Sequence, residues 1–320
     1  MNHGHPQSAP LTSEHPLHMT NRMEPATDPL NETASSKAAT SSTNTKPLEK
    51  EKKQEDSFLV FLTKLVAIVV IFRSFFFSPF NIPSESMLPR LQIGDYLLAA
   101  KWPYGFSKYS MPFSAPVIPG RIFTSQPDQG DVVIFKAPPG NDVDYIKRVV
   151  ALPGDQVQMK EGVLWLNGKP VPKQRIKDFT QPVSANMIDA AERDGRSPCV
   201  MAEFEATDAN GQRECRYPQF RETLPNGVSY NTIDMGPRPQ DDTPAVVVPE
   251  GHVFLMGDNR DNSMDSRFPA VEGGGIGIVP QANLVGRATI MMFSTDGGSS
   301  WMKPWTWFTA TRWSRIGGTF

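Results

Sequence analysis

Residues 144–155 read Asp-Tyr-Ile-Lys-Arg-Val-Val-Ala-Leu-Pro-Gly-Asp, an apolar run that ends in a Pro-Gly turn. The run is rich in β-branched residues and has the length of a strand. Similar runs, bounded by Gly, Pro, Asn or Asp, occur at 95–100, 131–135, 163–166, 245–248, 252–256 and 283–292. Because 30 prolines and 24 glycines interrupt the 320 residues, the pattern predicts a mainly β fold rather than a helical bundle.

A longer apolar stretch covers residues 58–77, about the length that a helix needs to cross a bilayer. Lys64 and Arg73 interrupt it, but both lie near an end and can reach the interface. We therefore expect one transmembrane helix at 58–77, with a buried core helix as the alternative. A cleaved signal peptide is disfavoured because the preceding segment is too long for its basic region.

The charges around this stretch predict its orientation. Four lysines, at positions 46, 50, 52 and 53, precede it, whereas Arg90 is the first basic residue after Arg73. The positive-inside rule then leaves residues 1–57 in the cytoplasm and exports the remainder. Residues 1–57 are poor in aromatics and rich in Pro, Ser and Thr, so we expect a disordered cytoplasmic tail.

The exported part divides by composition. Residues 172–245 are polar and rich in Pro and Asp, which predicts an inserted subdomain that does not share the main core. Residues 78–171 and 246–320 are expected to form that β core. Cys199 and Cys215 lie in the insertion, where a disulfide in an oxidising compartment would contribute about 3 kcal/mol. Two free thiols remain the alternative.

Two further features bear on partners. The net charge of -2 gives no basis for binding nucleic acid. Near the C-terminus, four tryptophans are mixed with basic residues, a composition that suits either the lipid headgroup region or core packing. These are Trp301, Trp305, Trp307 and Trp313, with Lys303, Arg312 and Arg315.

Histidine chemistry is nearly excluded. Four of the five histidines lie within residues 1–57, and only His252 belongs to the predicted folded region. A Ser-His-Asp triad would depend on that residue alone. A zinc site would have to combine it with two cysteines or carboxylates at unsuitable spacing, so no metal or cofactor is expected.

A serine and a lysine are the remaining candidates for catalysis. Ser86, in Pro-Ser-Glu-Ser-Met-Leu-Pro, follows the apolar stretch by nine residues. A serine hydroxyl needs a base, and lysine can serve only if burial lowers its pKa by about three units. Lys147 lies in an apolar strand, where alternation places it with Val149 and opposite Arg148. A solvated strand lysine is the alternative.

A polar run, Gly257-Asp-Asn-Arg-Asp-Asn-Ser-Met-Asp-Ser-Arg267, lies between apolar segments. Its turns can fix side-chain geometry, and Ser263 could orient a neutral amine. Asp265 and Arg267 could pair as a scaffold. The run also approaches a calcium loop starting at Asp261, but Ser266 occupies the glycine position and a proline interrupts the loop, which disfavours calcium.

These segments resemble those of the bacterial type I signal peptidases, the S26 family of membrane-bound serine endopeptidases. The matching stretches are 80–89, 130–136, 144–155 and 257–267, with further likeness at 283–288 and 314–318. The resemblance covers the chain from about residue 58 to its end. It implies a signal-peptidase-like β-sheet catalytic domain and hydrolysis without metal or cofactor.

By this resemblance, Ser86 is the nucleophile, Lys147 the general base and Ser263 the hydroxyl that orients the lysine. The oxyanion hole would be formed by the Ser86 backbone N–H and the Ser84 hydroxyl. Shallow apolar pockets for small side chains before the cut would be lined by Phe80, Ile82, Met87, Leu91, Tyr145 and Ile146.

The resemblance also implies a substrate, a cellular location and partners. The chain would remove signal peptides from exported preproteins at the outer, periplasmic face of the bacterial cytoplasmic membrane. Its partners would be preprotein signal peptides, the lipid bilayer and the secretion translocon. Two other hypotheses remain. One is a penicillin-binding enzyme, suggested by the S-x-x-K spacing of Ser300 and Lys303. The other is a membrane-anchored β-rich binding module without enzymatic activity.

Overall fold

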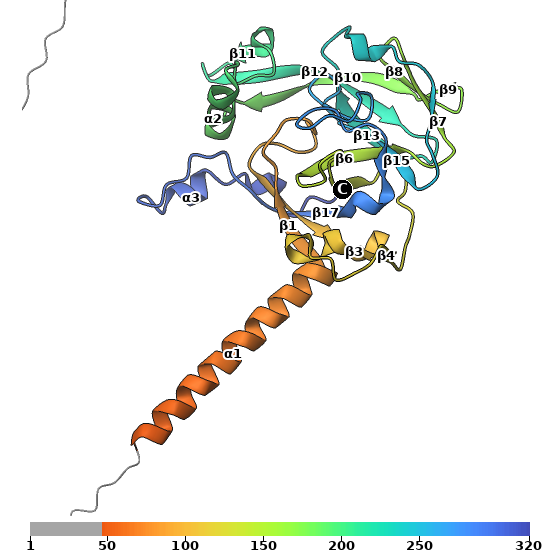
Figure 1. The fold of residues 1–320 in the computed structure, drawn as a ribbon. Coiled ribbons are helices and arrows are strands. Elements are labelled where there is room, and N and C mark those ends of the chain that lie inside the picture. Colours follow the sequence, from red (N-terminus) through yellow and green to blue (C-terminus); the bar gives the residue numbers. More distant parts are fainter. Residues whose placement is uncertain (1–46) are drawn as a thin grey trace, which may run out of the picture. The chain divides into compact units, whose positions relative to one another are not determined.

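The computed structural model describes residues 47–320, with side chains from Phe58 onward. The fold is mainly β, as predicted (Figure 1). The expected tail at residues 1–46 lies outside the described residues. Residues 47–57 are helical rather than disordered, because helix α1 (Pro47–Phe75) begins eleven residues before the expected start. This stretch is rich in Glu and Lys, which favour helices.

Helix α1 is the one described helix that is long and apolar enough to cross a membrane, through residues Phe58–Phe75. Only 6% of that window is buried against the rest of the described chain, which excludes the alternative of a core helix. The helix ends at Phe75, two residues before the predicted end, and Phe77 instead begins the first strand.

The main sheet has seven strands, in the order β1-β2-β17-β5-β6-β15-β16. Neighbouring strands are antiparallel. The predicted strands at 95–100 and 252–256 have the observed bounds. The seven strands are β1 (Phe77–Asn81), β2 (Asp95–Ala100), β5 (Val132–Lys136), β6 (Asp144–Ala151), β15 (His252–Met256), β16 (Val279–Pro280) and β17 (Leu284–Ser294).

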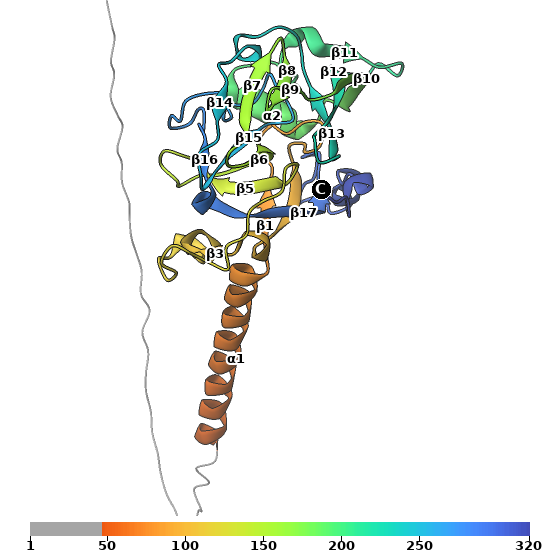
Figure 2. The same cartoon turned by 90° about the vertical axis from the view of Figure 1, so that its right-hand side faces the viewer.

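Smaller sheets complete the domain. Residues 172–245 form their own sheet from β10 (Lys173–Pro182), β11 (Glu205–Thr207), β12 (Arg213–Thr223) and β13 (Ser229–Ile233), together with helix α2 (Ala185–Asp194). Another sheet pairs β7 (Gln156–Lys160), β8 (Val163–Leu166), β9 (Lys169–Pro170) and β14 (Val246–Val247). Figure 2 shows these elements above the main sheet, with the short β3 (Phe106–Ser107) near the end of α1. Strand β3 pairs with β4 (Arg121–Ile122).

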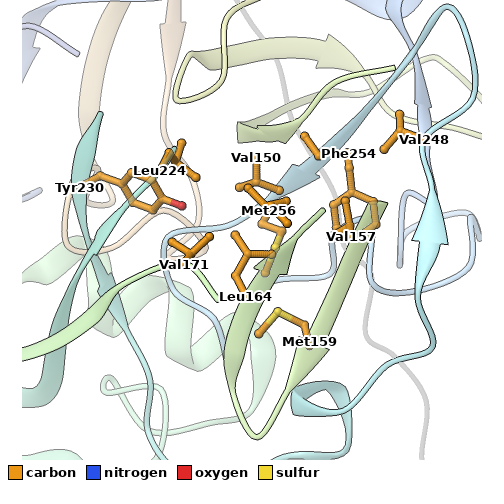
Figure 3. Close-up of a cluster of buried hydrophobic side chains, with 12 residues drawn as sticks. Val150, Val157, Met159, Leu164, Val171, Leu224, Tyr230, Val248, Phe254 and Met256 are labelled. Atoms are coloured by element: carbon orange, nitrogen blue, oxygen red, sulfur yellow. The ribbon is translucent and has the colours of Figure 1, made fainter. Parts of the chain in front are cut away.

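The prediction that residues 172–245 stay outside the main core is wrong. Leu224 and Tyr230 from this segment pack in one buried cluster with Val150 and Phe254 of the main sheet (Figure 3). A second cluster joins Leu88 to Tyr217 and to both cysteines. The segment is polar on average, but its few large apolar side chains fall on the faces that meet the main sheet. The average composition of the segment therefore gave no indication that it contributes side chains to the main core.

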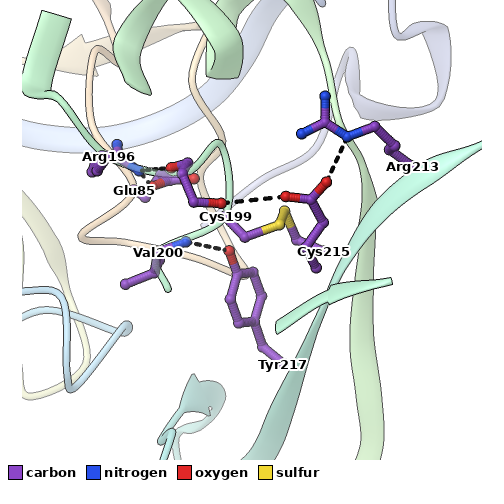
Figure 4. Close-up of a disulfide and its surroundings, with 9 residues drawn as sticks. Glu85, Arg196, Cys199, Val200, Arg213, Cys215 and Tyr217 are labelled. Atoms are coloured by element: carbon purple, nitrogen blue, oxygen red, sulfur yellow. Dashed lines mark hydrogen bonds and ion pairs between the residues drawn. A yellow bond between two sulfur atoms is a disulfide. The ribbon is translucent and has the colours of Figure 1, made fainter. Parts of the chain in front are cut away.

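Cys199 and Cys215 form a disulfide that links the region after α2 to β12 (Figure 4). The bond closes a sequence separation of 16 residues. By loop-closure entropy, replacing both cysteines with alanine should lower the free energy of unfolding by about 3 kcal/mol. Guanidinium unfolding of the detergent-solubilised protein, followed by tryptophan fluorescence, would measure this loss. A reductant should destabilise the wild type equally and leave the double variant unaffected; a reductant effect on the double variant would contradict the assignment.

The tryptophan-rich end of the chain is exposed. Trp301 and Trp305 are 86% and 65% exposed, and Trp301 meets Trp307 of helix α3 (Thr306–Thr309) edge to face at 4.8 Å. Core packing within the described chain is therefore not the role of these side chains.

Candidate active site

Ser86 lies on the segment that connects β1 to β2 and is 8% exposed. Hydrogen bonds to the carbonyls of Glu85 and Ser86 hold the backbone around this serine in place. Leu88 N–H donates to the carbonyl of Glu85 at 3.1 Å, and Asn259 N–H donates to the carbonyl of Ser86 at 3.1 Å. The Asn259 side-chain amide also donates to the Glu85 carbonyl at 3.2 Å. The polar run therefore holds the main chain at the candidate nucleophile.

Lys147 reaches Ser86 from strand β6. Its Nζ lies 2.7 Å from Ser86 Oγ and 3.1 Å from the carbonyl oxygen of Ile146. The side chain is buried, with the residue 4% exposed. On the opposite face of the same strand, Arg148 binds Asp258. The structure thus brings together the serine and the lysine that the sequence singled out, and it removes the alternative of a solvated strand lysine.

The environment of Lys147 favours its neutral form. Burial is the main cause and lowers the pKa of the amine from 10.5 to about 8. Asp265 and Asp258 act in the opposite direction, and the positive charge of Arg267 lowers the pKa further. A large fraction of this lysine can therefore be uncharged slightly above neutral pH, as a general base requires.

Asp265 and Arg267 form a fully buried ion pair beside the lysine. Arg267 Nε and Nη2 donate to the two carboxylate oxygens at 2.9 and 3.0 Å. Burial raises the pKa of the Asp265 carboxyl, but Arg267 and the Gly257 N–H outweigh it and hold the pKa below its ordinary value. The predicted pairing of Asp265 with Arg267 is thus observed, and the two charges act on the pKa of Lys147 in opposite directions.

Gly257 leaves no room for a side chain. A Cβ added there would lie 2.3 Å from Ser263 Oγ and 2.5 Å from the carbonyl oxygen of Ser86. Real side-chain carbons do not approach oxygen so closely. The absence of a side chain at position 257 therefore lets the polar run pack directly against the nucleophile segment.

The two other serines differ in their surroundings. Ser84 is exposed, and its Oγ lies 3.4 Å from Ser86 Oγ. Ser263 is buried against Gly257, and its Oγ has no hydrogen-bond partner among the described residues. Both serines are close to the reactive pair, but Ser263 makes no direct bond to Lys147.

Two buried ion pairs in this region were not anticipated. Arg148 donates to both oxygens of Asp258 at 2.7 and 2.6 Å, which joins β6 to the polar run. Arg260 donates to Glu222 of β12 at 2.5 Å. The charged residues are visible in the sequence, but their pairing joins positions far apart in the chain, and no local pattern predicts it.

An apolar cleft of about 440 Å³ opens beside Ser86 and Lys147. Its lining includes four of the predicted pocket residues, Phe80, Ile82, Tyr145 and Ile146. Met87 and Leu91 do not line it, which corrects the prediction. They are 1% and 0% exposed and pack in the core with Val132 and Ile134. The lining residues that were missed are Asn81, Pro83, Ile134, Val143, Asp144, Asn262, Met264 and Gly273.

A larger cleft, of about 800 Å³, lies elsewhere between the main sheet and the β12–β13 pair. Arginines and two aspartates contribute to its lining, but neither Ser86 nor Lys147 does. Size alone would select this cleft as the functional site. The smaller one holds the serine–lysine pair, so the chemistry identifies it as the candidate active site.

The family model described as "Signal peptidase, peptidase S26" matches residues 56–293. Signal peptidase I of Rickettsia typhi is 31% identical over 261 residues, which cover 79% of this chain and 84% of that protein. Signal peptidase I of Rickettsia akari is 32% identical over 240 residues, covering 72% of this chain and 77% of the relative. The matched region includes Ser86, Lys147 and the whole polar run.

Among solved structures, a signal peptidase I from Enterococcus faecalis is 23% identical and covers 52% of this chain and 98% of its own. Its TM-score is 0.25, too low to support an argument about the fold.

Proposed function

Because the chain belongs to the type I signal peptidases of the S26 family, we propose that Ser86 is its nucleophile and Lys147 its general base. The chain is a serine endopeptidase that removes signal peptides from preproteins. The assignment of residues rests chiefly on one observation, the 2.7 Å approach of a buried lysine amine to a serine hydroxyl. A lysine with its pKa lowered to about 8 can accept the serine proton.

In the proposed reaction, Lys147 takes the proton of Ser86 as the serine oxygen attacks the carbonyl carbon at the cut. The Ser86 N–H and the Ser84 hydroxyl stabilise the oxyanion. The lysine then donates its proton to the leaving amine, and an acyl-enzyme on Ser86 remains. Water, activated by the same lysine, hydrolyses the ester. Ser263, whose Oγ has no hydrogen-bond partner among the described residues, is proposed to orient the amine during the reaction.

The cleft supports recognition of an extended peptide. Its lining comes from the end of β1 and from the first half of β6, so a substrate strand can make main-chain bonds there. Phe80, Ile82, Tyr145 and Ile146 offer shallow apolar surfaces. We propose that they accept small side chains at the first and third positions before the cut.

We also propose an orientation for the chain in the membrane. One helix of the described chain fits a membrane anchor. The lysines before it support a cytoplasmic N-terminus and a catalytic domain at the outer face of the bacterial cytoplasmic membrane. The exposed tryptophans support contact with the lipid bilayer. We propose the secretion translocon as a further partner that delivers preproteins.

Incubation of the detergent-solubilised protein with a preprotein, followed by mapping of the cut, tests this function. We expect one cut, directly after a small residue at the end of the signal peptide. A binding module without enzymatic activity would leave the preprotein intact, and intact preprotein would refute the proposal.

The rate should depend on pH through Lys147. Below pH 8, the protonated amine cannot act as a base, so kcat/KM should fall about tenfold for each pH unit. Above pH 8, it should level off, because the amine is already neutral. A fluorogenic peptide assay from pH 6 to 10 would measure this profile. A midpoint near 10.5 would mean that the lysine is not desolvated, and a flat profile would exclude it as the base.

A further inference from the structure

Glu85 lies between the two serines of the nucleophile segment, and its side chain is buried on the side away from the cleft. Ser84 and Ser86 line the cleft, whereas Glu85 does not and is 2% exposed. Figure 4 shows its carboxylate directed toward Arg196, beside the disulfide. Glu85 is therefore the point at which the segment 172–245 contacts the residue next to the nucleophile.

Arg196 provides the charge that faces Glu85. Its Nη2 lies 3.1 Å from Glu85 Oε2, and it is the one cationic group within salt-bridge distance of that carboxylate among the described residues. Several contacts fix the position of Arg196. It directly follows the left-handed Gly195 that ends α2, its N–H donates to the carbonyl of Ala191 at 3.0 Å, and its guanidinium also pairs with Asp194 at 3.2 Å.

The two sides of this ion pair differ in their access to water. The Glu85 side chain is 1% exposed and that of Arg196 is 27% exposed. Burial raises the pKa of Glu85, and Arg196 opposes this shift. Without Arg196, Glu85 would be a buried and uncompensated acid, which the fold tolerates poorly. Without Glu85, Arg196 could still be solvated. The structure therefore predicts an asymmetry between the two single replacements.

We propose that Arg196 is a positioning residue, which compensates the buried carboxylate of Glu85 and so keeps the main chain at Ser86 in place, with the serine Oγ within reach of Lys147 Nζ. This inference rests on the proposed function of Ser86 and Lys147. The nucleophile segment is held by Asn259, which donates to the carbonyls of Ser86 and Glu85, and by the Glu85 side chain, with Leu88 packed in one cluster with the disulfide. A carboxylate that moves toward water would carry the adjacent Ser86 with it.

The test compares full-length Arg196→Gln, Glu85→Gln and the double variant with the wild type in detergent, using a preprotein substrate. Arg196→Gln should lower kcat by about 10- to 100-fold, because a displacement of about 1 Å at the reacting atoms has effects of this size. KM should stay within about twofold, because the cleft lining is unchanged. Glu85→Gln should be mild, and the double variant should recover to the level of Glu85→Gln, because no uncompensated acid remains.

A matched control is Arg216→Gln on β12, whose arginine pairs with Glu214 at the surface of the same segment. It should leave kcat unchanged. Equal effects of the two single variants, additive loss in the double variant, or loss of thermal stability with normal kcat per folded enzyme would each overturn the inference. If the wild type fails to cleave, the proposed function fails first, so the two failures are distinguishable.

Discussion

Replacing Lys147 with methionine is expected to abolish preprotein cleavage, by about 10⁴-fold or more, while the protein stays folded. Among the described residues, Ser86 Oγ has two hydrogen-bond partners, Lys147 Nζ and the Ser84 hydroxyl. Of these two groups, only the lysine amine can act as a base. Methionine fills a similar volume without a buried amine, so the melting temperature should be unchanged or higher. Ser86→Ala should have the same effect on cleavage, and the combined variant should be no worse.

Lys160→Met is the matched control, because Lys160 ends β7 at an exposed position outside the cleft. It should retain full activity. Both rates can be followed by gel analysis of the processed preprotein. Cleavage by purified Lys147→Met protein at near wild-type rates would refute the role of this lysine.

Replacing Arg267 with methionine is expected to damage both stability and catalysis. The Asp265 carboxylate would remain buried without its partner, which typically lowers the free energy of unfolding by about 3–5 kcal/mol. The same unpaired charge would raise the pKa of Lys147, because Arg267 now lowers it and Asp265 raises it. In the fraction that folds, the pH profile should move to higher pH, and activity at neutral pH should fall.

The compensating variant is Asp265→Leu combined with Arg267→Met, which removes both charges. Replacing both partners of a buried pair costs far less than removing one, so stability should largely return and the alkaline shift should disappear. Guanidinium unfolding and pH–rate profiles measure the two effects separately. An Arg267→Met enzyme with an unshifted profile would show that this pair does not control the lysine.

Local sequence patterns predicted much of the fold. The strands at 95–100, 163–166 and 252–256 were predicted with their observed bounds, because turn residues flank each apolar run. Patterns did not show that Leu224 and Tyr230 complete the main core, because isolated apolar residues in a polar segment carry no periodic signal. The early start of α1 at Pro47 was missed because charged helix formers resemble a disordered tail.

Local sequence patterns indicated some residues of the candidate site and missed or misplaced others. Ser86, Lys147, Asp265 and Arg267 could be chosen because each lies in an unusual local context. Met87 and Leu91 were wrongly placed in the cleft, because neighbouring residues of an irregular segment need not share a face. The contacts of Glu85 with Arg196, and of Arg148 with Asp258, join distant parts of the chain, so only the tertiary structure reveals them.

The dispersed origin of the site has a consequence for the timing of activity. Ser86 comes early in the chain, Lys147 follows later, and the polar run that secures both ends only at Arg267. A ribosome that has reached Lys147 has made the reactive pair, but not the residues that hold it in place. We therefore expect a chain whose synthesis stops before Arg267 to be inactive.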